Sequence, residues 1–107
     1  MISFEEFMGG MRYVNWDGTT QVARYRCWTL NPDTGVGPWF ADLPDPLVGV
    51  TLLRGGPYFY IWNKHGSNTV TVRDSAAVTV AALDPAKIAI VYLERNWRWG
   101  AKVMDKG

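Results

Sequence analysis

Hydrophobic positions along most of the chain recur with a period of two, which is the spacing of β-strands. The alternation spans residues 21–30 and returns in residues 58–62, where tyrosines and a tryptophan alternate with phenylalanine and isoleucine. Apolar side chains occupy both faces of that second segment. In the first segment the pattern places Cys27 on the core side. Both segments are therefore predicted to be strands.

The second half of the chain contains more short β-type segments. Residues 47–53 and 88–93 are apolar runs, and Val alternates with Thr in residues 69–73 and 78–81. The Val/Thr pair predicts a hairpin with valines inward and threonines outward. About six to eight strands at a spacing of 8–12 residues predict an all-β chain, folded as a single antiparallel β-sandwich or jelly-roll-like domain.

Proline and glycine mark the segments that connect these strands. Residues 31–46 are dense in turn-forming residues, so we expect a loop around Trp39 and Phe40. Residues 95–99 are expected to form a last strand with both of their tryptophans on one side.

The N-terminal segment has a different pattern. Ser3 and Glu6 have the spacing of a capping box, and apolar residues follow at helical positions. The glycine pair at positions 9–10 limits a helix, since each glycine costs about 0.8–1.0 kcal/mol relative to alanine. We therefore predict a short helix or accessory arm over residues 1–16 and a β-sandwich domain over residues 17–107.

Composition narrows the function classes for this chain of 107 residues. Eleven Lys and Arg balance ten Asp and Glu without forming runs, which argues against binding of nucleic acid. One cysteine and one histidine are too few for an internal disulfide or a structural zinc site. No apolar run has the roughly 18 residues of a membrane span, and the acidic N-terminus is unlike a signal peptide. We expect synthesis in the cytoplasm without export.

Three motifs resemble catalytic or metal-binding sites. The Asp-Thr-Gly tripeptide at residues 33–35 matches the tripeptide of aspartic proteases but follows a turn instead of an apolar strand, which favours a simple turn. Asp42 and Asp45 flank a proline and fit a solvated loop better than a glycosidase pair. His65 has no partner at ligand spacing. We therefore predict no enzyme activity, no metal and no cofactor.

The aromatic content is the most informative feature of the composition. Six Trp, five Tyr and four Phe exceed what a small core readily holds, and exposed Trp, Tyr and Arg are typical of protein interfaces. The alternative is a mixed solvent face with tryptophans packed under arginine stems. The interface candidates are Trp16, Arg24, Arg26, Trp28, Trp39, Phe40, Arg95, Trp97, Arg98 and Trp99.

Residues 58–74 and 78–93 resemble small structural proteins of tailed bacteriophages. The shared pattern is an aromatic strand, a polar turn ending in Ser-Asn-Thr, a Val/Thr hairpin, and a turn into an Ala/Ile/Val strand. Ala77 and Ala86 stand where a turn glycine is common in this pattern. The resemblance covers about a third of the chain.

The resemblance implies a β-sandwich used as a virion structural protein. The first expectation is a capsid decoration or cement protein that binds the major capsid protein or another virion protein. It would be a homo-oligomer or be present in many copies on a symmetric shell, made in the host cytoplasm and located in the virion, with no nucleic-acid or membrane partner. The alternatives are a phage tail or fibre component, or a carbohydrate-binding module that stacks exposed Trp and Tyr on sugars.

Overall fold

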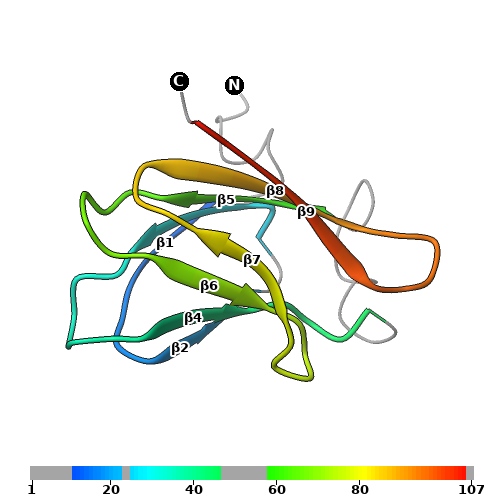
Figure 1. The fold of residues 1–107 in the computed structure, drawn as a ribbon, viewed down its shortest axis with the longest axis horizontal. Helices are drawn as coiled ribbons and strands as arrows, with labels where there is room; N and C mark the ends of the chain where they lie inside the picture. The colour runs from blue at the N-terminus through cyan, green and yellow to red at the C-terminus, as the bar shows by residue number, and fades with distance from the viewer. Residues whose placement is uncertain (1–10, 23–24, 47–57, 106–107) are drawn as a thin grey trace, which may run out of the picture.

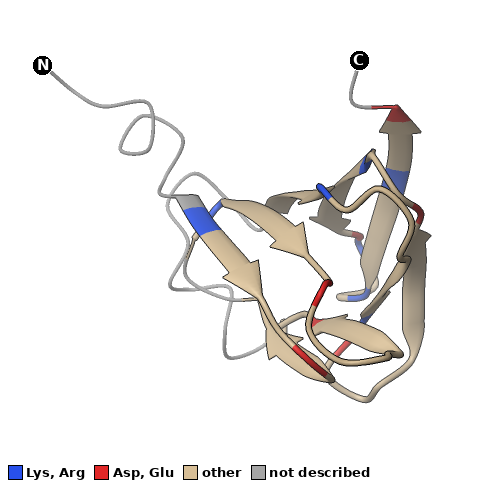
Figure 2. Ribbon diagram, turned by 90° about the vertical axis from the view of Figure 1, so that its left-hand side faces the viewer, with Lys and Arg blue, Asp and Glu red and all other residues tan. Residues whose placement is uncertain are grey.

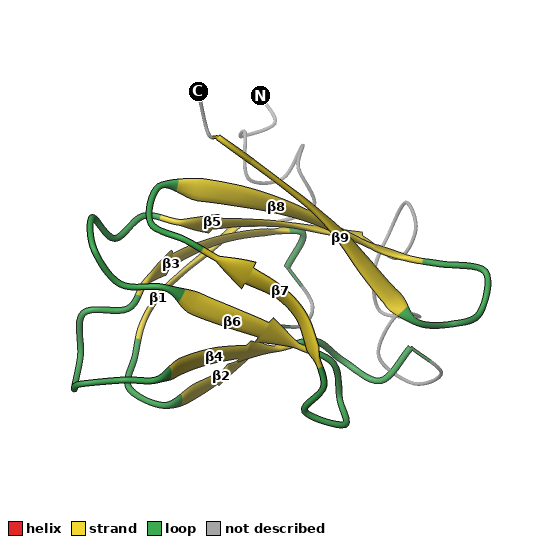
Figure 3. Cartoon of the chain, viewed as in Figure 1, coloured by secondary structure: helices red, strands yellow, loops and turns green. Residues whose placement is uncertain are grey.

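The computed structural model describes residues 11–22, 25–46 and 58–105. Within these ranges the regular secondary structure consists entirely of β-strands (Figures 1 and 3). The strands form two packed sheets, so the all-β prediction is confirmed. Sheet A contains, in spatial order, β1 (Met11–Asn15), β3 (Cys27–Asn31), β5 (Tyr58–Asn63), β8 (Lys87–Leu93) and β9 (Trp99–Asp105). Sheet B contains β2 (Thr19–Gln21), β4 (Trp39–Asp42), β6 (Val70–Arg73) and β7 (Thr79–Leu83).

The chain passes from sheet A to sheet B three times, and this repeated crossing gives parallel pairing. It runs from β1 to β2, from β3 to β4 and from β5 to β6, so β1, β3 and β5 pair in parallel, as do β2, β4 and β6. The β5–β8, β6–β7 and β8–β9 pairs are antiparallel. The prediction of an antiparallel sandwich is therefore wrong for the first six strands. Parallel strands need a long crossover, and here a strand of the opposite sheet supplies it instead of a helix.

Asparagine ends each sheet A strand from which the chain crosses to sheet B. Asn15, Asn31 and Asn63 are the last residues of β1, β3 and β5. Asn63 is fully buried and donates from Nδ2 to the carbonyls of Asn68 and Leu83, at 2.7 and 2.9 Å. Its Oδ1 accepts the backbone N–H of His65. The buried amide thus satisfies backbone groups of the β5–β6 connection and of the last residue of β7.

The core lies between the sheets and contains four of the six tryptophans. Trp16, Trp28, Trp39 and Trp99 are each exposed by 8% or less. Each of these four indole N–H groups donates to a backbone carbonyl: Trp16 to Gly18 (2.9 Å), Trp28 to Tyr25 (2.8 Å), Trp39 to Thr34 (2.9 Å) and Trp99 to Pro44 (2.9 Å). The core absorbs these rings because its connecting segments offer acceptors for the indole N–H groups.

Several predicted element boundaries are corrected by the structure. Residues 21–30 are not one strand, because β2 ends at Gln21 and β3 begins at Cys27 in the other sheet. Residues 31–46 contain β4, and residues 94–98 form a turn before β9. Residues 58–62, the hairpin of residues 69–81 and the strand at 88–93 are confirmed as β5, β6–β7 and β8. The predicted strand at 47–53 lies outside the described residues.

The N-terminal boundary of the β domain also differs from the prediction. Residues 11–15 form β1, which pairs in parallel with β3, and Trp16 is buried in the core. These residues belong to the sheet and not to an arm, because the alternating Arg-Tyr-Val-Asn sequence fits a pleated edge strand. The predicted helix and the rest of the predicted arm, residues 1–10, lie outside the described residues.

Candidate partner-binding surface

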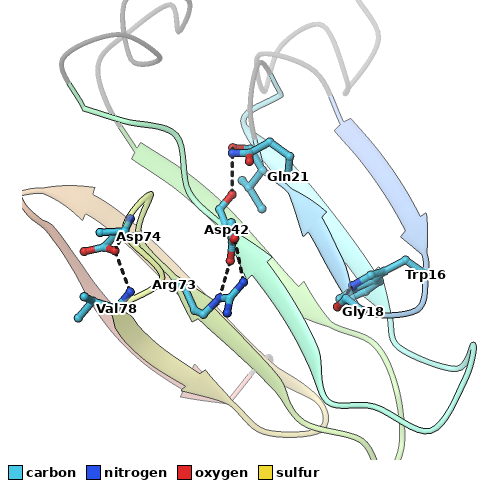
Figure 4. A network of polar contacts seen from close by, with 9 residues as sticks. Trp16, Gly18, Gln21, Asp42, Arg73, Asp74 and Val78 are labelled. Atoms are coloured by element: carbon cyan, nitrogen blue, oxygen red, sulfur yellow. Dashed lines mark hydrogen bonds and ion pairs between the residues drawn. The ribbon is translucent and has the colours of Figure 1, made fainter.

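The outward side of sheet B is polar. Gln21 donates from Nε2 to the carbonyl of Asp42 at 2.9 Å, and the Asp42 carboxylate accepts two hydrogen bonds from Arg73, at 2.7 and 2.9 Å (Figure 4). The Arg73 guanidinium lies 3.9 Å from the centre of the Phe40 ring. The hydrogen bond to Asp42 raises the pKa of Arg73. This side of the molecule has the alternation of a solvated sheet.

The outward side of sheet A is apolar instead. In β5 and β8, buried residues such as Phe59 and Val91 alternate with partly exposed residues that are themselves large and apolar. The register places Tyr58 opposite Tyr92, and the following outward pairs continue the same surface. We call this surface the aromatic face; it consists of Tyr58, Tyr60, Trp62, Ile88, Ile90 and Tyr92.

Tyrosine rings of the aromatic face are held in fixed positions. Arg26 is 4% exposed, donates from Nη1 to the carbonyl of Tyr58 at 2.9 Å and places its guanidinium 3.6 Å from the Tyr58 ring centre. The Tyr58 and Tyr60 rings meet edge to face at 82°. Tyr92 is 42% exposed and lies over Gly100, where a Cβ atom would stand 3.0 Å from its ring. Cation–π and edge-to-face contacts therefore order this surface.

The β8–β9 connection carries the most exposed tryptophan of the described residues. Two backbone hydrogen bonds close the turn, from Glu94 N to Arg98 O at 2.8 Å and from Trp97 N to Glu94 O at 3.0 Å. Trp97 is 59% exposed and has a φ of 61°, and Arg95 and Arg98 beside it are exposed. We call residues 94–98 the Trp97 turn; Figure 1 shows this connection standing out from the ends of the strands.

The predicted interface residues that the structure describes are buried, half-buried or exposed. Trp16, Trp28, Trp39, Trp99 and Arg26 are buried, so placing them on a surface is wrong, and Trp99 does not share a face with Trp97. Phe40 is half-buried beneath Arg73, and Arg24 lies outside the described residues. Arg95, Trp97 and Arg98 are exposed and adjacent, as predicted.

Sequence reasoning did not include Tyr58, Tyr60 or Tyr92 among the interface candidates. The available signal was that residues 58–62 and 88–93 are apolar at both odd and even positions. A strand with that pattern has two apolar faces, and only one of them contributes to the core between the sheets.

The catalysis-like motifs have structural roles. The tripeptide at residues 33–35 lies in the β3–β4 connection, where Thr34 donates to Asn15 Oδ1 at 2.7 Å and Gly35 has a φ of 79°. His65 Nδ1 accepts the backbone N–H groups of Ser67 and Asn68 at 3.1 and 3.0 Å. Within the described ranges, no three His, Cys, Asp or Glu residues are grouped as a metal site.

Cys27 is buried, as predicted, but it does not face the core between the sheets. The register pairs it with Tyr60 on the outward side of sheet A, whereas its neighbour Trp28 belongs to the core, so the predicted facing of these two residues is reversed. Burial raises the pKa of its thiol, and the positive charge of Arg26 opposes part of that shift.

In Figure 2 basic and acidic residues are interspersed along the described chain, with no large region of one sign. Of the described residues, none forms a helix with the length and apolar character needed to cross a membrane.

Comparison with known proteins gives no relative for this chain. No protein-family model, curated protein or solved structure matches it.

Proposed function

We propose that this chain is a non-enzymatic structural protein of a tailed bacteriophage, which decorates or cements the capsid by binding the major capsid protein. The observation that carries the proposal is the contrast between the two sheets: sheet B is polar on its outward side, whereas sheet A has the aromatic face. An ordered apolar surface of this kind is typical of a protein-binding site.

The physical basis of a decorating role is cumulative binding. Burial of apolar surface contributes about 25 cal/mol per Å², before the cost of association is subtracted. A bound partner stabilises an assembly by about 2.7 kcal/mol when its concentration is one hundred times Kd. Repetition over many shell sites turns that increment into resistance to heat or internal pressure. The net charge of +1 allows many copies to pack closely.

The architecture also supports a second location, in the tail or a fibre. The strands β1, β3 and β5 and the strands β2, β4 and β6 form two parallel stacks in register, so successive units of the chain add in one direction. Stacked units of this kind are the basis of elongated repeat proteins.

A carbohydrate-binding module receives less support from the ring geometry. Sugar stacking needs aromatic rings that lie flat and side by side. In the aromatic face the Tyr58 and Tyr60 rings stand at 82° to one another, with ring centres 5.6 Å apart. Quenching of tryptophan fluorescence by oligosaccharides would be the sign of that activity, and we expect none.

The test compares phage shells prepared with and without the protein. We expect shells with the protein to rupture at a higher temperature, with the difference unchanged by EDTA. Tyr92→Ser should weaken shell binding about tenfold or more, because it removes an anchor of the aromatic face. The matched control is Val36→Ser, which alters a 96% exposed apolar residue of the β3–β4 connection and should bind like the wild type. Equal rupture temperatures would overturn the cement role.

A further inference from the structure

Two turns of the described chain share one backbone geometry but differ at their fourth residue. In residues 74–78, Asp74 N donates to Val78 O at 2.9 Å and Ala77 N donates to Asp74 O at 3.0 Å (the β6–β7 turn). The Trp97 turn has the same two hydrogen bonds at equivalent positions. The fourth residue has a φ of 64° in Ala77 and 61° in Trp97.

The shared geometry shows that the turn does not require tryptophan. A left-handed backbone favours glycine, tolerates alanine at some cost, and is a genuine outlier for a bulky residue. Within the described residues, the Trp97 indole has no hydrogen bond or ring contact that offsets this cost. A strained and exposed aromatic residue is a reason to look for a role outside the chain.

The neighbours of Trp97 indicate the chemistry of its partner. Arg95 and Arg98 lie on either side of Trp97 in the sequence, are exposed, and form no ion pair with the described residues. Lone exposed arginines beside an aromatic anchor complement carboxylates around an apolar pocket. Glu94, the one acidic residue of the turn, places its carboxylate beside Gly100, next to the Tyr92 ring. The turn is thereby continuous with the aromatic face.

We propose that the Trp97 turn is the anchor of the interface, with the Trp97 ring inserted into an apolar pocket rimmed by carboxylates on a shell subunit. This inference rests on the proposed function, because it names the chemistry of the same partner. It goes further in assigning the main share of the affinity to one strained residue at the end of the aromatic face.

The decisive experiment measures stability and shell binding on the same variants. Trp97→Gly should raise the melting temperature, because it relieves the left-handed strain, and weaken binding to shells about thirtyfold or more. Trp97→Ala, which copies Ala77, should remain folded and lose binding similarly. The control Ala77→Gly should raise the melting temperature and bind like the wild type. A variant that is more stable but binds shells more weakly would show that Trp97 serves partner binding and not the fold.

Charge variants test the acidic rim. Arg95→Glu combined with Arg98→Glu should weaken shell binding, with the largest effect at low salt. Lys64→Glu is the control: this exposed residue follows β5 at the end away from the Tyr58–Tyr92 pair, and its substitution should change binding far less. An equal effect of the control would overturn the acidic rim.

The outcomes separate the two proposals. If the wild type binds shells and the Trp97 variants bind equally well, the anchor is overturned and the proposed function stands. If the wild type does not bind shells, the proposed function is overturned and the anchor with it. Lower stability of Trp97→Gly would show that the tryptophan serves the fold and would also overturn the anchor.

Discussion

Replacing Ala77 or Ala86 by glycine should raise the free energy of unfolding. Both alanines have left-handed backbones, with φ of 64° and 63°, in the β6–β7 and β7–β8 turns. Both side chains are exposed, so removing either methyl group sacrifices no core packing. The substitution therefore acts on the backbone alone, at positions where a turn glycine is common.

The magnitude is the difference of two effects. A left-handed backbone costs an L-residue about 1–2 kcal/mol. Against this, glycine lowers the free energy of unfolding by about 0.4–1 kcal/mol, because the unfolded chain has more conformations to lose on folding. Each variant should therefore gain about 0.5–1 kcal/mol. The five residues of β7 separate the two turns by about 17 Å of extended chain, so the effects should add in the double variant.

Urea and thermal unfolding followed by circular dichroism would measure the gain. For a domain of this size, 1 kcal/mol corresponds to a shift in Tm of about 4–8 °C. The matched control is Ala82→Gly, an exposed alanine inside β7 itself, where glycine should destabilise by about 0.5–1 kcal/mol. Destabilisation by Ala77→Gly or Ala86→Gly of the same sign as the control would refute the assignment of strain to these turns.

Three further predictions concern the framework. Gly37→Ala should destabilise by about 2–5 kcal/mol in urea unfolding, because φ is 79° and the new Cβ would lie 2.6 Å from the buried Trp39 ring. Asn63→Ala should cost about 2–4 kcal/mol, since three buried or partly buried backbone groups lose their partner, and Asn63→Asp should cost more because a carboxylate would face two carbonyls. The pKa of the Cys27 thiol is raised in the folded protein, so with rising pH the thiol ionises in the unfolded chain before it does in the folded one. The stability advantage of the wild type over Cys27→Ala should therefore fall as the pH rises past about 8.5. Denaturant titrations of both proteins at several pH values would measure this change.

Strand positions could be predicted from the sequence where the alternation was undisturbed. Residues 58–62 and the hairpin at 69–81 were recognisable because each strand lies in one sheet and ends in polar turn residues. β4 was not, because four residues inside a segment rich in proline and glycine give too little pattern to detect a strand. Alternation across residues 21–30 was misleading, because it continues through the place where the chain changes sheets.

The direction of pairing and the fate of the tryptophans depend on distant contacts. A strand has the same side-chain period in parallel and antiparallel sheets, so the pattern of β3 does not reveal its parallel neighbours. The number of aromatic residues suggested that the core could not hold them all. Yet Trp99 is buried and donates its indole N–H to the carbonyl of Pro44, 55 residues earlier in the chain. Trp97, in contrast, is exposed, as the sequence analysis predicted.

Pairing direction alone does not account for the aromatic face. Strands of parallel sheets are typically apolar on both sides because both sides are covered. The outward residues Tyr58, Tyr60 and Trp62 of β5 follow that rule, since β5 has a parallel neighbour in β3. However, β4 and β6 of sheet B are also parallel, and they carry Asp42 and Arg73 outward. The difference between the sheets fits a covering layer specific to sheet A, and in the proposed function the shell subunit supplies that layer.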